Sequence, residues 1–207
     1  MKIKFCSLPR RALVPLLALA LACAIVLPQR AAAESTVASG AGALTTAARL
    51  DFSIVIPHFL FLRVGSAGAG IDLITFTPPA GNVGDSTVIA GVGGDIGGGV
   101  VTVQVRANGG QVVITPTNNS GGAGLSNGAG GNINYNEIST ATNTGNVPAP
   151  TLSNAGGTAA NPVLNAGTIT NRAAQWTYTY LNTTVPAVGT YGTSANGGRV
   201  TYTATSP

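Results

Sequence analysis

The sequence predicts an all-β protein built as an antiparallel sandwich or barrel. Residues 34–207 are rich in Gly, Asn, Thr and Val; Gly and Asn disfavour helices, whereas Thr and Val favour strands. Short alternating apolar segments recur between Gly, Asn and Pro clusters, and no segment has a helical period. A parallel β-solenoid would need a fixed repeat, which is absent. About 170 residues are enough for one hydrophobic core.

The first 33 residues are typical of a secretory signal peptide. Basic residues precede the apolar run from Leu13 to Leu27, and Ala31 and Ala33 form a small-residue cleavage site. We therefore expect cleavage after Ala33 and export. We divide the chain into a signal peptide (1–33), a flexible leader (34–46), an apolar strand (47–57) and a β-sandwich domain (58–207).

Cleavage changes what the composition means. Five of the ten basic residues lie within residues 1–33, whereas all six acidic residues lie within residues 34–207, so the mature chain has net charge −1. It has no Lys, and its five Arg residues are scattered, which excludes a nucleic-acid partner that needs clustered positive charge. Both cysteines, Cys6 and Cys23, lie in the signal peptide. The mature domain must therefore be stabilised without disulfides.

Eight segments have strand character, and they define the expected core. The segment from Val100 to Thr117 resembles a hairpin, with Asn108-Gly109-Gly110 as its turn. The expected strands are Leu50–Ile56, Phe59–Val64, Ile71–Thr77, Val100–Ala107, Gln111–Thr117, Ile133–Thr140, Ala174–Leu181 and Arg199–Thr205. The expected core includes Phe59, Phe61, Val103, Val105, Val113, Trp176, Tyr178 and Val200.

Catalytic and metal-binding chemistry finds little support in the sequence. His58 is the only histidine, so it would have to serve any nucleophile as base, and a solvated strand end is the more ordinary role. The carboxylates are dispersed singly, whereas a metal site requires clustered ligands. The glycine-rich segment around Asp95 lacks the Lys of a phosphate-binding loop. We therefore predict no enzyme activity, no cofactor, no metal and no membrane span in the mature chain.

Three aromatic residues share one face of an expected strand. Trp176, Tyr178 and Tyr180 alternate with smaller side chains. They are either core residues or a solvent-facing platform that stacks on glycans.

The segment Leu50–Gly65, "LDFSIVIPHFLFLRVG", places two apolar strands on either side of Pro57. Leu50, Phe52, Ile54 and Ile56 alternate on one face of the first strand. At the other end of the chain, Val200, Tyr202 and Ala204 alternate with threonines. Strands near the termini are readily donated to another molecule or held by one.

This layout resembles the alpha-type subunits of chaperone–usher fimbriae, similar to the major pilins of the colonisation-factor class. The resemblance rests on a signal peptide, no cysteine pair, "LDFSIVIP" followed by "HFLFLRVG", and the final "GRVTYTATS". It implies an immunoglobulin-like sandwich that lacks its last strand, which the N-terminal strand of the next subunit supplies. It also implies that a periplasmic chaperone holds the last strand and that an outer-membrane usher assembles the fibre. The Gly- and Asn-rich middle, Gly91–Asn132, departs from that pattern.

Two functions follow as expectations. The first is a structural subunit of a surface fibre (a pilin of a fimbrium), with Leu50, Phe52, Ile54 and Ile56 as the donor strand. Val200, Tyr202 and Ala204 then form the edge strand that meets a chaperone or a donor. The alternative is a monomeric secreted or surface-attached adhesion module that binds glycans through Trp176, Tyr178 and Tyr180. In that case the first strand folds back into its own domain.

Overall fold

The computed structural model describes residues 35–207, so the predicted signal peptide lies outside the described residues. The chain divides into two units between Val55 and Ile56. In the first unit, residues 35–55 contain no assigned helix or strand. The hydroxyls of Thr36 and Thr46 are 2.5 Å apart, and Thr36 also donates to the carbonyl of Ala47, which closes a loop in the leader.

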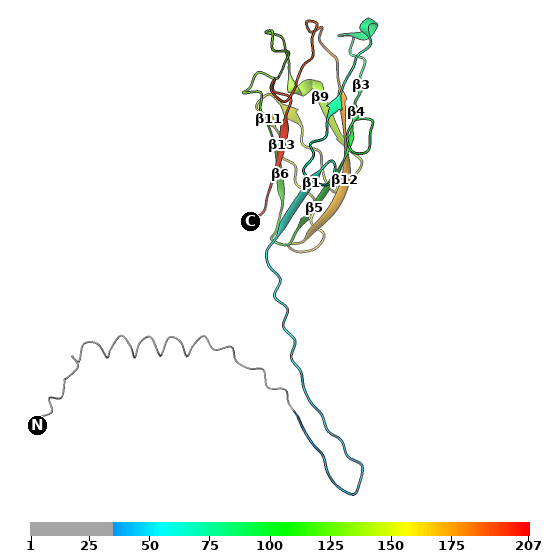
Figure 1. The fold of residues 1–207 in the computed structure, drawn as a ribbon, viewed down its shortest axis with the longest axis vertical. Helices are drawn as coiled ribbons and strands as arrows, with labels where there is room; N and C mark the ends of the chain where they lie inside the picture. Colours follow the sequence, from blue (N-terminus) through cyan, green and yellow to red (C-terminus); the bar gives the residue numbers. More distant parts are fainter. Residues whose placement is uncertain (1–34) are drawn as a thin grey trace, which may run out of the picture. The chain divides into compact units, whose positions relative to one another are not determined.

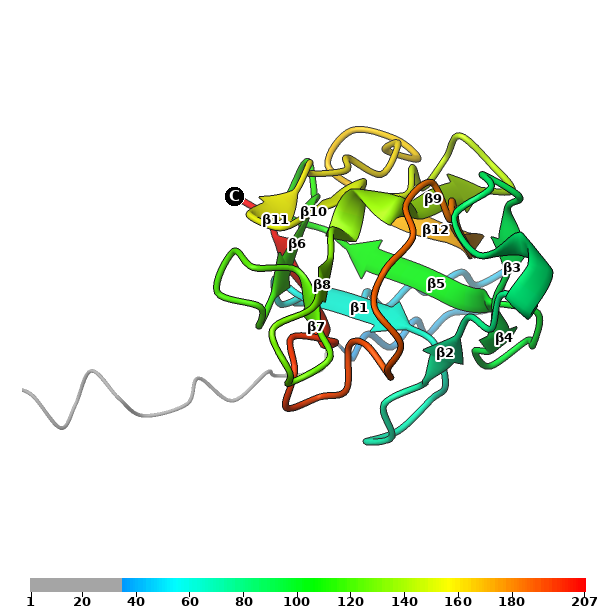
Figure 2. The same cartoon turned by 90° about the horizontal axis from the view of Figure 1, so that it is seen from above.

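The second unit, Ile56–Pro207, is built from antiparallel strands in two layers (Figures 1 and 2). One layer is a five-stranded sheet in which β12 (Thr170–Tyr180) lies between β5 (Val100–Ala107) and β9 (Ile138–Thr142). Strand β1 (Leu60–Val64) pairs with the other side of β5, and β3 (Ile89–Ala90) pairs with the end of β12.

The other layer is centred on β6 (Val113–Asn118), which pairs with β13 (Val200–Thr205). On the edge of β6 away from β13, Ile114 forms an isolated antiparallel β-bridge with Ala160. Short elements complete the domain: β2 (Ile74–Thr75) with β4 (Val92–Gly93), β7 (Leu125–Ser126) with β8 (Asn132–Ile133), β10 (Leu152–Ser153) with β11 (Gly156–Gly157), and the 3₁₀ turns η1 (Ala80–Asn82) and η2 (Tyr135–Glu137). The predicted all-β, antiparallel class is confirmed, and the paired layers are consistent with a sandwich.

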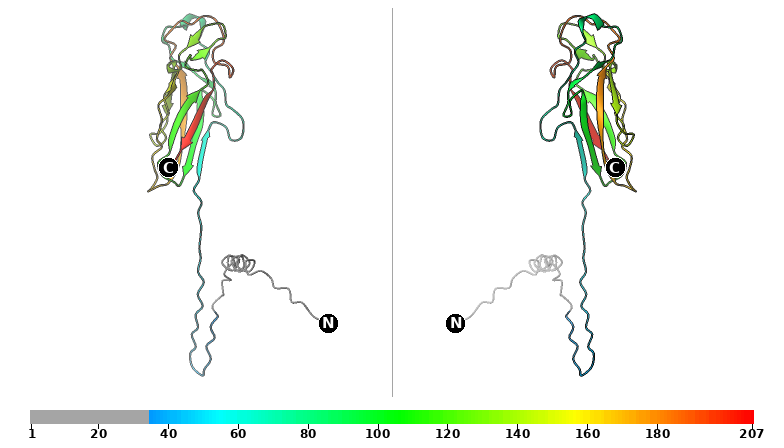
Figure 3. Two further views of the ribbon diagram at one scale, coloured as in Figure 1. Left: turned by 90° about the vertical axis from the view of Figure 1, so that its left-hand side faces the viewer. Right: turned by 90° about the vertical axis from the view of Figure 1, so that its right-hand side faces the viewer.

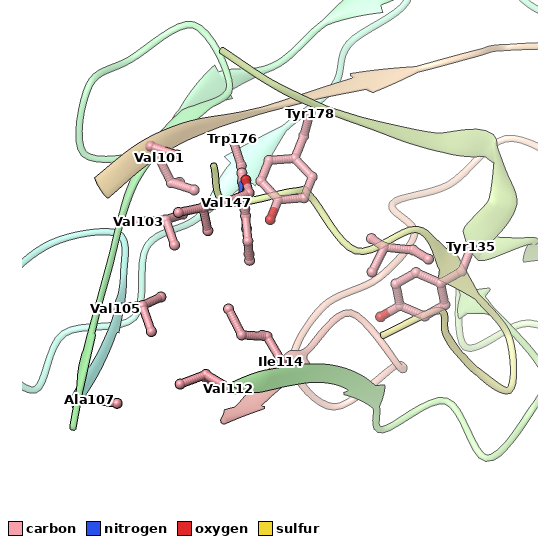
Figure 4. Packing of buried hydrophobic residues seen from close by; sticks show 12 residues of the cluster. Val101, Val103, Val105, Ala107, Val112, Ile114, Tyr135, Val147, Trp176 and Tyr178 are labelled. Carbon is pink, nitrogen blue, oxygen red and sulfur yellow. The ribbon is translucent and has the colours of Figure 1, made fainter. Parts of the chain in front are cut away.

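The core lies between the two layers (Figure 4). The inward face of β5 supplies Val103 and Val105, both fully buried, and β12 supplies Trp176. Ile114 of β6 faces them from the second layer, as Figure 4 shows. The indole N–H of Trp176 donates to the carbonyl of Val147 at 3.1 Å, so the largest core side chain has its polar atom satisfied.

Three predicted core residues were placed on the wrong face. Phe59 and Phe61 are 42% and 41% exposed, because the alternate residues Leu62 and Val64 pack against the core. Val113 is only half-buried, and its neighbours on both sides, Val112 and Ile114, are fully buried. In both segments the two faces of the strand are apolar, so alternation alone could not identify the inward one. Val103, Val105, Trp176 and Tyr178 are buried as predicted, and Val200 packs against the core while partly exposed.

The predicted hairpin between β5 and β6 is also wrong. The two strands belong to different layers, and the segment Asn108–Gln111 crosses between them. Gly110, at φ +123°, donates its N–H to Thr168 next to β12 instead of closing a turn onto β5. The expected strand Ile133–Thr140 is divided by η2, and the expected strand Ile71–Thr77 contracts to the two residues of β2.

Candidate functional site

Strand β13 has one edge without a ladder partner among residues 35–207. Ile114 directs its N–H and C=O to Ala160, on the side of β6 away from β13. Because the direction of these groups alternates along a strand, Ala204, which lies opposite Ile114, directs its own N–H and C=O away from β6. By the same alternation Tyr202 and Val200 do so too. The unpaired edge of β13, called here the acceptor edge, therefore offers the backbone groups of Val200, Tyr202 and Ala204.

Strand β1 also has an open edge. Its ladder with β5 is continued by hydrogen bonds from Gly65 to Thr102 and from Asn108 to Phe59, so the odd-numbered residues face β5. The backbone groups of Leu60, Leu62 and Val64 therefore face away from it. The open edges of β1 and β13 approach within 8 Å between Cα atoms, without a ladder between them. The start of β1 lies at the same end of the domain as the end of β13 (Figures 1 and 3).

The side chains along both open edges face the core but are incompletely covered. Leu62 and Val64 of β1 are half-buried, as are Val200, Tyr202 and Ala204 of β13, and all five pack against the buried cluster. Alternation in the sequence predicted the β13 residues but not those of β1. Every residue from Phe59 to Leu62 is apolar, so no alternation marked this edge.

Tyr202 connects the acceptor edge to the opposite sheet. Its ring lies 5.3 Å from that of Trp176, and its hydroxyl is 2.8 Å from the hydroxyl of Tyr178. Burial raises the pKa of Tyr178 to about 12 and raises that of Tyr202 well above its usual value. Both phenols are therefore neutral at physiological pH and serve as hydrogen-bonding groups in an apolar site.

The predicted donor residues are large apolar side chains that are strongly exposed. Leu50, Phe52, Ile54 and Ile56 are 71%, 86%, 86% and 73% exposed, and none belongs to an assigned strand. Single exposed apolar residues are ordinary on protein surfaces, whereas four within seven residues form a continuous apolar stretch, which is unusual for a surface.

Asn108 holds the chain at the start of the domain. Its carboxamide accepts the N–H of Phe59 at 2.9 Å and donates to the carbonyl of Pro57 at 2.8 Å. A single side chain thus imitates the next step of the β1–β5 ladder, which keeps residues 57–59 extended. This role was not evident from the sequence, where Asn108 was assigned to a turn.

The glycan platform proposed as an alternative is ruled out by burial. Trp176, Tyr178 and Tyr180 are 0%, 7% and 6% exposed, so their ring faces cannot stack on a sugar. The other interpretation, that they are core aromatics, is confirmed. A shallow depression is lined by asparagines, but Asn154 there already donates to Asn134 and accepts the N–H of Tyr135.

Several other polar residues form local contacts. His58 is exposed, with its Nε2 atom 3.4 Å from the Ser206 hydroxyl. Hydrogen bonds from Ser66 hold the pKa of Asp72 below its usual range, and Asp95 accepts the N–H of Thr102. Within residues 35–207 no group of three or more His, Cys, Asp or Glu residues could hold a metal ion. The same residues include no helix long and apolar enough to cross a membrane.

Comparisons with protein-family models, curated proteins and solved structures find no match for this chain.

Proposed function

We propose that this chain is the structural subunit of a bacterial surface fibre, assembled by donation of the segment Leu50–Ile56 to the next copy. The observation that carries the proposal is the coexistence of an open, half-covered strand edge and an exposed apolar segment of matching length. Each would be a liability in a monomer, because open edges and apolar patches promote association. In a fibre, the apolar segment of one copy would cover the open edge of the next.

The strand order supports this proposal. An immunoglobulin-like sandwich places strands A, B, E and D in one sheet and C, F and G in the other. The order β1-β5-β12-β9 corresponds to A-B-E-D, and β6-β13 corresponds to C-F. The position of strand G is then the open edge of β13, next to β1.

The reach of the chain favours donation to another copy over self-insertion. A strand antiparallel to β13 would end near Val200, whereas β1 begins near the other end of β13, where His58 meets Ser206. Six residues of strand span roughly 20 Å, but residues 57–59 can cover only about 10 Å. A strand in the opposite direction would need a turn at these residues, and Asn108 holds them extended.

The expected stabilisation is sufficient for assembly. Burying four large apolar side chains at roughly 1.5–3 kcal/mol each contributes about 6–12 kcal/mol, before ladder hydrogen bonds and less the entropy of ordering the segment. Export, a periplasmic chaperone that covers the acceptor edge and an outer-membrane usher complete the proposal. A chaperone would serve the physical need to cover this edge before assembly.

The proposal is tested by two substitutions in the mature protein, Ile54→Asp and Val55→Asp. These neighbours are similarly exposed, 86% and 90%, but lie on opposite faces of an extended strand. Ile54→Asp would bury an unpaired carboxylate in the acceptor copy, which costs several kcal/mol, whereas residue 55 stays in solvent. Light scattering and electron microscopy should find fibres for Val55→Asp and monomers for Ile54→Asp.

A peptide with the sequence of residues 46–57, "TAARLDFSIVIP", should then raise the melting temperature of the monomeric Ile54→Asp chain, because a ligand that binds only the folded state stabilises it. Fibres from Ile54→Asp would contradict the proposal. So would a wild-type chain that remains monomeric and is destabilised by Ile54→Asp, because the segment would then belong to its own domain.

A further inference from the structure

We propose that the donated segment pairs antiparallel with β13 in a single register, with Ile56 opposite Val200, Ile54 opposite Tyr202 and Phe52 opposite Ala204. This inference rests on the proposed function and specifies which side chain of one copy meets which side chain of the next. Antiparallel pairing is chosen because such ladders are the more stable per residue.

Only registers that differ by two residues need comparison. The free backbone groups of β13 belong to Val200, Tyr202 and Ala204, whose side chains face the core. A slip of one residue would turn the apolar face of the donor to solvent. The alternatives therefore place either Ile56 or Phe52 opposite Tyr202.

The first alternative, Ile56 opposite Tyr202, requires a residue that already packs against its own domain. It places His58 opposite Val200 of the neighbouring copy. His58 instead contacts its own domain: a Cβ added to Gly109 would overlap the His58 ring, so the ring rests directly on that glycine. In the proposed register the six residues of β13 pair with Asp51–Ile56, and Pro57, which has no N–H, falls just beyond the ladder.

The second alternative, Phe52 opposite Tyr202, places Ile56 opposite Gly198. Gly198 is not part of β13, and its N–H bonds to Thr193 within a turn. This register also places the rings of Phe52 and Tyr202 directly opposite each other. The proposed register puts the largest donor side chain, Phe52, over the smallest acceptor residue, Ala204. Complementary volumes of this kind fill a core without voids or overpacking.

Disulfide trapping distinguishes the registers. In the proposed one, Ser53 lies opposite Thr203 as a non-hydrogen-bonded pair, with Cα atoms about 4.5 Å apart, which suits a disulfide. A slip of two residues moves the partner to Thr201 or Thr205 and separates residues 53 and 203 by roughly 8 Å, which is too far. Both cysteines of the sequence lie in the predicted signal peptide, so the mature chain adds no competing thiol.

The experiment compares the double variants S53C/T203C, S53C/T201C and S53C/T205C of the mature chain, oxidised and run on non-reducing gels. We expect a ladder of covalent multimers for S53C/T203C, at least tenfold stronger than for the other two. A stronger ladder for T201C or T205C overturns the register but leaves donation intact. Fibres without any ladder overturn the antiparallel pairing. If all three variants and the parent chain remain monomeric, strand donation itself is contradicted.

Discussion

The hydroxyls of Tyr178 and Tyr202 meet at 2.8 Å and join the two layers of the domain through their side chains. Tyr178 comes from the centre of the large sheet, and Tyr202 comes from the strand with the open edge. A polar contact inside the core therefore helps to position the acceptor edge. Such buried contacts are costly when one partner is missing.

Removing either hydroxyl alone should cost more than half of the stability that is lost when both are removed. Tyr202→Phe leaves the Tyr178 hydroxyl buried without a partner, at a cost of about 1–3 kcal/mol, and Tyr178→Phe should behave alike. The double variant should lose less than the sum, because neither unpaired hydroxyl remains. Urea denaturation of the four chains in the Ile54→Asp background measures this coupling without assembly. Strict additivity would mean that the two hydroxyls do not interact.

Alkaline pH should destabilise the domain through the same tyrosines. Burial raises the pKa of Tyr178 to about 12, whereas an unfolded tyrosine ionises near 10. The stability that this group contributes is complete below pH 10 and is lost as pH rises from 10 towards 12, by roughly 3 kcal/mol at the upper limit. Denaturant midpoints measured between pH 9 and pH 12 should fall, and they should fall less steeply in Tyr178→Phe. Equal slopes would contradict the role of Tyr178.

Asn182 should be among the most sensitive polar residues outside the acceptor edge. It is fully buried at φ +56°, where it accepts the N–H of Gly84 and donates to the carbonyl of Asn82. Asn182→Ala removes both hydrogen bonds and strains the backbone, so we expect a loss of about 2–4 kcal/mol. Asn182→Gly relieves the strain and should cost about 1 kcal/mol less. Equal midpoints for the two variants would show that the backbone conformation contributes nothing.

The reassigned faces of β1 can be checked with one pair of variants. Phe61→Thr replaces an outward side chain and should cost less than about 1 kcal/mol, because threonine suits an exposed strand. Leu62→Thr replaces a residue that packs on the core and should cost about 2 kcal/mol or more. The comparison uses denaturation midpoints of both variants. A larger effect at Phe61 would restore the face predicted from the sequence.

The sequence predicted the strands wherever one face alone was apolar. Val103 and Val105 alternate with polar residues in β5, and that strand was located with its boundaries and its core face. Where both faces are apolar, as around Phe61 and Val113, the inward face is decided by the elements that pack on it. The local sequence does not contain this tertiary information. The crossing at Asn108 was mistaken for a turn because Asn-Gly favours both, and only Thr168, about 60 residues away, decides between them.

The candidate site was predicted in part for a similar reason. The apolar faces of Leu50–Ile56 and of β13 were identified by their period of two; the side chains of the first are exposed and those of the second are half-buried. The open edge of β1 and the role of Asn108 were missed because both depend on strand order. Burial of Tyr180 was undecided for the same reason: an aromatic stripe has the same period in a core as on a surface.

A final prediction concerns Asn108 and the conformation of residues 57–59, which follow the donor segment. Asn108→Ala removes the acceptor for the Phe59 N–H and the donor to the Pro57 carbonyl. We expect amide hydrogen exchange at Phe59 to accelerate about fivefold, because roughly 1 kcal/mol of local hydrogen bonding is lost. Fibres should still assemble, but electron micrographs should show them bending more sharply.

Asn143→Ala is the matched control for this variant. Asn143 accepts the N–H of Gln175 at 2.9 Å in the same way. It does not contact residues 57–59, which form the junction before β1. Its loss should expose the Gln175 amide to exchange and leave Phe59 and the bending of the fibres unchanged. If Phe59 exchanges at the same rate in Asn108→Ala as in the parent chain, other contacts hold the junction. The extended conformation of residues 57–59, on which the argument against self-insertion depends, would then need a different cause.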